Sequence, residues 1–402
     1  MAAIIFDPLN PGAYADRQSV FERLRNDAPL HTVEIGDQQI RLLSRHADVA
    51  RIISDPTTVM NPPGQDTPIA YGKGPAADLW RNAVSMMDPP RHACARRAVS
   101  RPFTHRNVEQ FREMVNDVVA TVFSGTDFRN TDVVHDVAMQ IPMRVICKLL
   151  GIPTEDWSKL QSWTNDFLRI FLPDASAPET LARTQQASQN FIDYFGEMID
   201  QRLDKPRDDL TSEFAAAMDT AGGISRAGLI GALRGLLTAG FETTAATISA
   251  GFYAFAKQPE QFKQLREQPE LIPGAVEELL RWETPVQVVV RYLGEDTQLH
   301  ASVLPAGEQI WLLTGAANRD PRKYDEPSLL DVKREVGEHF SFGGGRHFCL
   351  GAYLARLELQ ILLQQLVTQC ASVELRCDEI QRRDNLQFPS IKSLPVVLHK
   401  AS

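Results

Sequence analysis

One cysteine of the chain lies in a loop whose composition could support a thiolate. The segment FSFGGGRHFCLG, Phe340 to Gly351, holds three consecutive glycines and then Cys349, and an apolar-periodic run that predicts a helix follows at once. Glycine tolerates positive φ and carries no side chain, so this loop is expected to let the backbone approach a flat or bulky ligand. The unpaired amides and the dipole at the start of the helix favour an anionic sulfur. Cys349 is therefore a candidate nucleophile, redox thiol or metal ligand.

The surroundings of Cys349 narrow this choice. No CxxC partner accompanies it, which argues against thiol exchange and against a zinc knuckle. An axial ligand of a haem iron is the chemistry that remains. The alternative is a structural cysteine beside a flexible loop, because a lone cysteine is most often a buried core residue.

A second unusual segment interrupts a long helical pattern. The pattern from Ser225 to Ala256 predicts a helix of about 32 residues, which would be about 48 Å long at the rise of an α-helix. Its middle, Leu236 to Ser249, places Gly240, Glu242 and Thr243 where a helix should be most regular. Such a local violation of helix preferences is typical of a functional site. The alternative is a kinked helix without chemistry.

Three cationic side chains require anionic partners. His92 and Arg96 are four residues apart after the helix-start signal at Asp88, so they share one helical face. Arg291 closes a β-branched run that would otherwise be buried completely, so it also needs a charged partner. For His92 and Arg96 the alternative is a solvated basic face.

The elements that position these residues are mostly helices, and the predicted fold class is mainly α with small β-sheets. A helix is predicted to open at Ser44, which is a plausible N-cap. After that helix, five proline residues and little periodicity between residues 54 and 85 predict a long irregular segment. Helices are predicted over 14–27, 107–124, 131–150 and 154–204, and short strands over 30–34, 39–43 and within 286–321.

Composition limits the class of protein. The chain has 402 residues, a net charge of -9 and no basic tract, which argues against nucleic-acid binding. No window approaches the length of a membrane-spanning helix, and the start lacks the features of a signal peptide. The five cysteines are scattered, which suits a reducing compartment. We therefore expect a soluble, cytoplasmic protein that does not bind membranes.

The loop at Cys349 resembles the haem-binding signature of the cytochrome P-450 family. FGGGRHFCLG matches Phe-Gly-x-Gly-x-His-x-Cys-x-Gly at every fixed position. The resemblance extends over essentially the whole chain and implies a single cytochrome P-450 domain over 1–402, with a long central helix across the haem. It implies haem b as cofactor, with Cys349 as the iron ligand. The loop residues that it implies for haem binding are Phe342, Gly343, His347 and Gly351.

Other motifs of the family give roles to the remaining candidates. The segment Ala239 to Thr243 resembles the oxygen-activation motif, which implies that Ala239 and Gly240 lie against the haem and that Glu242 and Thr243 organise proton delivery. The resemblance also implies a buried scaffold triad of Glu278, Arg281 and Arg334, with Leu330 standing where the family usually has Phe. The residues implied to bind the haem propionates are His92, Arg96, Arg291 and His347.

The implied function is a haem-thiolate monooxygenase, an oxidoreductase that inserts one oxygen atom of O2 into a small or medium, largely apolar organic substrate. The chain has no flavin or iron–sulfur motif, so a ferredoxin or flavodoxin would supply electrons, docked by basic residues such as Arg97, Arg346 and Arg356. Two alternatives are a peroxygenase, which would carry Arg-Pro in place of Glu242 and Thr243, and a non-catalytic haem sensor. The residues expected to line the substrate pocket are Leu236, Ala239, Val288, Val289 and Phe388.

Overall fold

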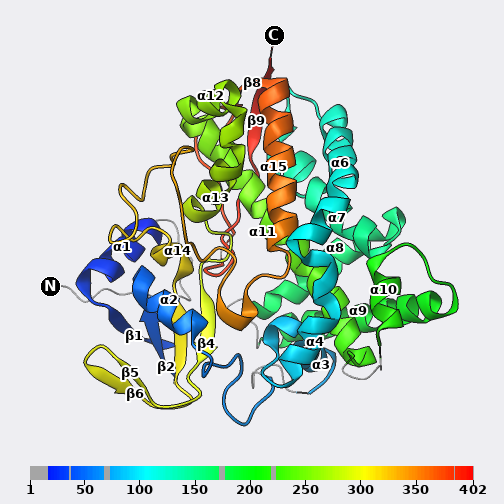
Figure 1. Ribbon diagram of the computed structural model, residues 1–402, viewed down its shortest axis with the longest axis vertical. Helices are drawn as coiled ribbons and strands as arrows, with labels where there is room; N and C mark the ends of the chain where they lie inside the picture. The colour runs from blue at the N-terminus through cyan, green and yellow to red at the C-terminus, as the bar shows by residue number, and fades with distance from the viewer. Residues whose placement is uncertain are drawn as a thin grey trace. The chain divides into compact units, whose positions relative to one another are not determined.

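Helices make up most of the computed structural model, which describes residues 17–35, 38–67, 73–171, 177–218, 223–383 and 385–401. The mainly helical fold class is confirmed (Figure 1). The longer helices are α1 (Arg17–Asp27), α2 (His46–Ser54), α3 (Pro75–Asn82), α4 (Arg91–Ser100), α6 (Arg112–Gly125), α7 (Gln140–Leu150), α8 (Trp157–Phe167), α9 (Pro178–Asp204), α11 (Arg226–Lys257), α12 (Pro259–Glu267), α13 (Ile272–Trp282) and α15 (Ala352–Gln369). The short helices are α5 (His105–Val108), α10 (Leu210–Ala216) and α14 (Thr314–Ala317).

The strands form three small sheets. One has the order β1-β2-β7-β4, in which β2 pairs with β7 in parallel and the other neighbours are antiparallel. The second has the order β3-β9-β8, and β5 and β6 form a two-stranded ribbon. The strands are β1 (Leu30–Ile35), β2 (Gln38–Leu43), β3 (Thr131–Asp132), β4 (Val289–Tyr292), β5 (Thr297–Leu299), β6 (Ser302–Leu304), β7 (Gln309–Leu312), β8 (Cys370–Leu375) and β9 (Pro395–Lys400).

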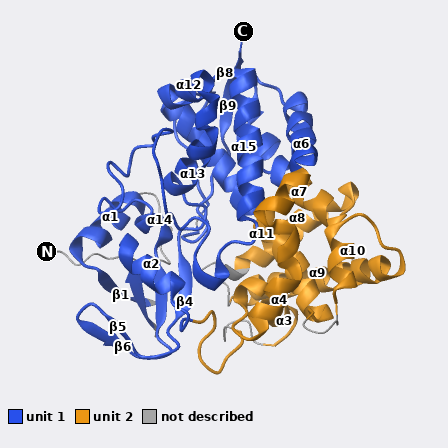
Figure 2. Cartoon of the chain, in the orientation of Figure 1, with its two compact units in different colours: residues 1–58, 112–142, 242–402 blue, residues 59–111, 143–241 orange. Residues whose placement is uncertain are grey.

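Two compact units divide the chain (Figure 2). Unit 1 comprises residues 1–58, 112–142 and 242–402, and it contains all three sheets with α13 and α15. Unit 2 comprises residues 59–111 and 143–241, and its core is made by α7, α8, α9 and the first half of α11. The single cytochrome P-450 domain over 1–402 stays a prediction. Among the helices of the described chain, none has the length and hydropathy needed to cross a bilayer.

The long helix matches its prediction closely, whereas two local predictions were wrong. Helix α11 contains 32 residues and continues without interruption through Ala239 to Thr244. Ser44 is not the N-cap of α2; that position is Arg45, and no side chain caps it. The segment 54–85 is not irregular throughout, because Pro75 at the first helical position starts α3.

Candidate functional site

The loop that carries Cys349 is held by its own backbone. The amide of Cys349 donates to the carbonyl of Phe342 at 2.8 Å, and the amide of Gly343 donates to Phe340 at 2.9 Å. A short 3-10 turn, Gly345–His347, lies between them. These bonds fix the backbone on both sides of the cysteine, whose side chain is exposed three residues before α15 begins. The loop therefore presents a thiol from a defined position.

Two of the loop glycines are required by contact with α2. A Cβ at Gly344 would lie 2.8 Å from a side-chain carbon of Ile53, and one at Gly345 would lie 2.5 Å from the Ile53 carbonyl oxygen. Gly345 also has φ +61, which favours glycine. The sequence led us to expect these glycines to admit a ligand. For Gly344 and Gly345, the close neighbour in the structure is instead the end of α2.

The other cysteines differ from Cys349 in their surroundings. Cys147 and Cys370 are buried, and burial raises the pKa of Cys147 to about 12 and that of Cys370 to about 11. Both are therefore neutral thiols at physiological pH. Cys94 is exposed on α4 and Cys377 is half-buried, but neither lies in a glycine-rich loop ahead of a helix. Cys349 alone among the five combines exposure with that setting.

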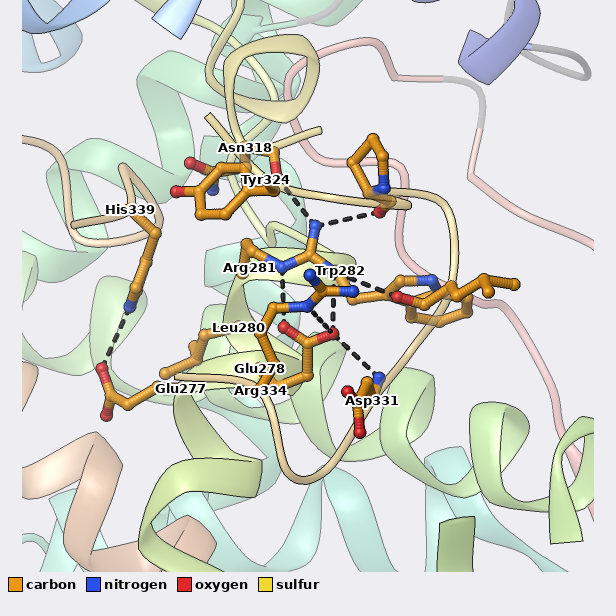
Figure 3. A network of polar contacts seen from close by, with 12 residues as sticks. Glu277, Glu278, Leu280, Arg281, Trp282, Asn318, Tyr324, Asp331, Arg334 and His339 are labelled. Carbon is orange, nitrogen blue, oxygen red and sulfur yellow. Dashed lines mark hydrogen bonds and ion pairs between the residues drawn. The ribbon is translucent and has the colours of Figure 1, made fainter. Parts of the chain in front are cut away.

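A buried ionic network lies on α13 (Figure 3). Arg281 makes a two-point contact with Glu278, at 2.7 and 2.8 Å, and neither side chain is exposed. Arg334 adds a third contact to Glu278 at 3.2 Å, so the predicted triad is confirmed. The remaining donors of Arg281 reach the backbone carbonyls of Asn318, Pro327 and Leu329. Because charge and hydrogen bonds are both satisfied, the triad can remain buried.

Asn318 connects this triad to the cysteine loop. Its carbonyl accepts from Arg281 at 2.9 Å, while its side-chain oxygen accepts from the amide of Phe340 at 2.8 Å. Its side-chain amide donates to Ser341 at 3.0 Å. The start of the loop is thus tied to α13 through one buried side chain. Sequence reasoning missed Asn318, because an asparagine 37 residues from its arginine partner gives no local pattern.

A second network supports the loop from α15. Arg356 donates to both oxygens of Glu277, at 2.7 and 2.8 Å, and its guanidinium lies 4.4 Å from the centre of the Phe342 ring. His339 contacts the same carboxylate at 3.0 Å. Burial favours the neutral acid, but Arg356 and His339 outweigh it and lower the pKa of Glu277 to about 2. Arg356 is therefore paired with an acid of its own chain, and its suggested role as a docking cation stays a prediction.

The acid of the central helix is paired with the C-terminal loop. Glu242 Oε2 lies 3.2 Å from an Nη1 of Arg383, and the side chains are 14% and 38% exposed. Glu242 Oε1 is sealed from solvent, and no described residue forms a hydrogen bond with it. Burial raises the pKa of Glu242, and Arg383 opposes this only in part. One turn further along α11, Ala246 lines a small, partly open pocket together with Arg382 and Ser390.

The same loop meets the segment that precedes β4. The amide of Gln287 donates to the carbonyl of Gln387 at 2.9 Å, and the side chain of Gln387 donates to the carbonyl of Val288 at 3.2 Å. The structure thereby brings Phe388, the neighbour of Gln387, to the segment that contains Val288 and Val289. The Val288 side chain is 2% exposed and packs in a core cluster, whereas Val289 is half-buried.

The predicted cation sites belong to different units. Arg291 is 4% exposed on β4 of unit 1 and donates to the carbonyl of Val290 at 2.8 Å, and His347 and Gly351 are in the cysteine loop of that unit. His92, 5% exposed, and Arg96 lie on α4 of unit 2.

In unit 2, the predicted residues of α11 line one side of the helix. Ala239 is exposed in the middle of a largely buried helix, and Leu236, three residues earlier, is half-buried. At Gly240, a Cβ would lie 3.3 Å from Ile146 of α7, so a larger residue would crowd that contact. Thr243 lies in the part of the helix that belongs to unit 1, which begins at Glu242, and its carbonyl accepts from the Thr247 hydroxyl at 3.1 Å.

Comparison with known proteins identifies close relatives of the whole chain. The sequence profile described as cytochrome P450 matches residues 14–395. Mycinamicin IV hydroxylase/epoxidase of Micromonospora griseorubida is 35% identical over 370 residues, 89% of each chain. The polyketide biosynthesis cytochrome P450 PksS of Bacillus subtilis is 33% identical over 414 residues, 100% of each chain.

Solved structures agree with the sequence relatives. The structure of PksS superimposes with a TM-score of 0.89 at 31% identity, covering 98% of this chain and 100% of that one. P450BioI, in complex with acyl carrier protein ligated to hexadec-9Z-enoic acid, has a TM-score of 0.89 at 28% identity, covering 96% and 100%.

Proposed function

The chain belongs to the cytochrome P450 family, and on that premise we propose that Cys349 is the thiolate ligand of its haem iron. The protein is an oxidoreductase, a haem-thiolate monooxygenase with haem b as cofactor. Haem bound through a thiolate activates O2 so that one oxygen atom enters an organic substrate. The observation that carries the proposal is the exposed thiol of Cys349 in a loop fixed by backbone hydrogen bonds.

The residues around Cys349 fit such a group. The thiol is accessible, and the loop backbone is held to α13 and α15 by Asn318 and Arg356, so little reorganisation is needed on binding. The positive end of the α15 helix dipole favours the anionic sulfur. Phe342, Gly343 and Gly351 belong to the loop that would enclose the proximal face, with Ala239 and Gly240 of α11 on the other face.

Four cationic or polar side chains would bind the two propionates. Arg291 is a buried guanidinium on β4, and a guanidinium binds a carboxylate through charge-assisted hydrogen bonds. His347 lies in the cysteine loop of the same unit. His92 and Arg96 share one face of α4, as their spacing of four residues requires. We assign Arg291 and His347 to one propionate and His92 and Arg96 to the other.

Glu242 and Thr243 would supply protons. Because burial raises the pKa of Glu242, this acid keeps its proton to a higher pH than an exposed glutamic acid does. A protonated acid next to a hydroxyl can pass a proton through ordered water. This pair favours the monooxygenase over a peroxygenase, which would have Arg-Pro there, and over a sensor, which would need no proton donor.

The substrate we propose is a small or medium, largely apolar organic compound. The residues that would line its pocket are Leu236, Ala239, Val288, Val289 and Phe388. Relatives with names that specify mycinamicin or polyketide biosynthesis support an organic substrate of this kind. A ferredoxin or flavodoxin would deliver electrons, with the exposed Arg97 as one docking cation. We propose a cytoplasmic location.

Carbon monoxide difference spectroscopy tests the iron ligand. The reduced wild-type holoprotein should give the red-shifted Soret band of thiolate ligation, and Cys349→Ser should lose it. Cys94→Ser is the matched control, because Cys94 is also exposed but lies on α4. Retention of the red-shifted band in Cys349→Ser would rule out the proposed ligand.

A further inference from the structure

One arginine of the central helix is buried without an acidic partner. Arg234 of α11 is 7% exposed, and its guanidinium lies 4.4 Å from the centre of the Phe167 ring on α8, within unit 2. Its Nε is sealed from solvent and has no acceptor among the described residues. Within the described residues, the guanidinium forms neither an ion pair nor a hydrogen bond. A buried positive charge therefore stands uncompensated beside an aromatic ring.

Arg234 nevertheless remains charged. Burial lowers the pKa of Arg234 to about 10, and no charged neighbour in the described chain contributes to the shift. At neutral pH the side chain thus carries its proton in a site that disfavours charge. Stacking on Phe167 uses only the face of the guanidinium. Its N–H groups lie in the plane of that group and stay available to an acceptor.

Arg202 is a second buried arginine of unit 2, and its charge is compensated within the chain. It is almost completely buried, but its Nε donates to Asp209 at 2.7 Å and an Nη donates to the carbonyl of Gly151 at 2.9 Å. The charge of Arg202 is thereby compensated within the chain. Among the described residues, Arg234 has neither an acidic partner nor a carbonyl acceptor. Stabilisation of the fold therefore does not explain why this charge is buried.

Two observations indicate room and polarity next to Arg234. Apart from its chain neighbours and the backbone of its own helix, no atom of the described residues lies within 4 Å of a Cβ placed on Gly235, so the described structure leaves space beside this part of α11. On α8, the hydroxyl of Thr164 is also sealed from solvent and has no hydrogen-bond partner in the described part of the chain. Thr164 lies one turn before Phe167, on the same face of the helix. A ligand with a polar end would satisfy groups on both helices.

We infer that Arg234 binds the carboxylate of the substrate. This inference rests on the proposed monooxygenase function and narrows its substrate class to organic acids with an apolar body. The planar fork of the guanidinium can bind both oxygens of a carboxylate. One guanidinium balances the single charge of a carboxylate, whereas a phosphate monoester would leave part of its larger charge uncompensated. Arg234 precedes Ala239 by five residues, about 7.5 Å along the helix and about 140° around it. The acid group is therefore held beside α8, away from the carbon that is oxidised.

Paired ligands and paired variants test this site in the ferric holoprotein. Tetradecanoic acid and para-butylbenzoic acid are compared with the methyl ester and the amide of the same acids, by titrating the low- to high-spin shift. The wild type should bind at least one acid more than about tenfold tighter than its neutral partner. Arg234→Gln should remove that preference while leaving affinity for the neutral partner within about twofold. Arg234→Lys should keep part of it, because the charge remains but the fork is lost.

Arg183→Gln is the matched control, since it removes an exposed arginine of the same unit that pairs with Asp166. This variant should retain the preference for acids. An equal loss of affinity for acid and neutral ligand in Arg234→Gln, or no acid preference in the wild type, would overturn the inference. Either of these two results would leave the carbon monoxide difference spectrum of the holoprotein unchanged. Failure of the proposed haem-thiolate function would instead be seen as loss of the red-shifted Soret band in the wild type.

Discussion

Glu242 and Arg383 form an ion pair between the middle of α11 and the C-terminal loop, 141 residues apart in the sequence. The carboxylate is largely buried and the guanidinium is the more exposed partner. One oxygen of Glu242 contacts Arg383 at 3.2 Å and the other has no hydrogen-bond partner in the described chain. The protonation of the proposed proton donor is thus set by two opposed effects, burial and a single cation that solvent can reach.

Arg383→Gln should shift the pH dependence of turnover. Burial raises the pKa of Glu242 and Arg383 lowers it, so removing the guanidinium raises the pKa further. If protonated Glu242 is the active form, activity falls as pH rises through this pKa. The alkaline limb of coupled product formation should therefore move to higher pH in the variant. Arg376→Gln, which alters an exposed arginine elsewhere in the same unit, should leave the limb in place. A shift towards lower pH would contradict the assigned protonation state.

Thr243→Ala should uncouple electron consumption from product formation. Without the hydroxyl, proton delivery slows by at least about tenfold, and reducing equivalents appear as hydrogen peroxide. NADH consumption, product and peroxide are measured together, with a surrogate ferredoxin system and the compound that gives the largest spin shift. Thr244→Ala is the control, because Thr244 is buried and is expected to be structural. Equal coupling in Thr243→Ala and the wild type would remove Thr243 from the proton path.

The triad of Glu278, Arg281 and Arg334 should contribute strongly to the free energy of unfolding. Arg281→Ala leaves Glu278 as a buried carboxylate with one remaining cation, so the free energy of unfolding should fall by about 3–5 kcal/mol. Arg334→Gln should be milder, because Arg334 makes one contact to Glu278 at 3.2 Å and is 14% exposed. Urea unfolding of the holoprotein, with the surface variant Arg266→Gln as reference, measures both. A larger loss in Arg334→Gln than in Arg281→Ala would contradict this ranking.

The parts of the molecule that the sequence predicted well are those with local patterns. The continuous apolar periodicity of α11 gave its length to within a residue at each end, and the spacing of Glu278 and Arg281 placed them on one helical turn. Partners distant in sequence were missed. Neither Arg383 nor Asn318 lies in a motif, since each acts by tertiary contact across more than 20 residues.

Burial without compensation was equally invisible in the sequence. Arg234 appears there as one polar residue in an apolar run, and only the structure shows that no acid of the described residues accompanies it. The packing contact of Gly344 and Gly345 was missed for a similar reason. Their freedom of backbone was evident, but contact with Ile53 could not be read from a segment nearly 300 residues away. Packing partners, unlike periodicity, are set by the whole fold.

Glu277 should stabilise the folded protein in a defined pH range. Its pKa is lowered from 4.5 to about 2, so its contribution is fully present above about pH 4.5 and is lost as pH falls towards 2. A shift of this size corresponds to about 3 kcal/mol. Glu277→Gln should therefore be less stable than the wild type at pH 7. The difference should shrink at pH 4 and below, as measured by urea unfolding across the series. A difference that stayed constant from pH 7 to pH 3 would show that Arg356 and His339 do not hold Glu277 ionised, and that the support of Phe342 comes from packing alone.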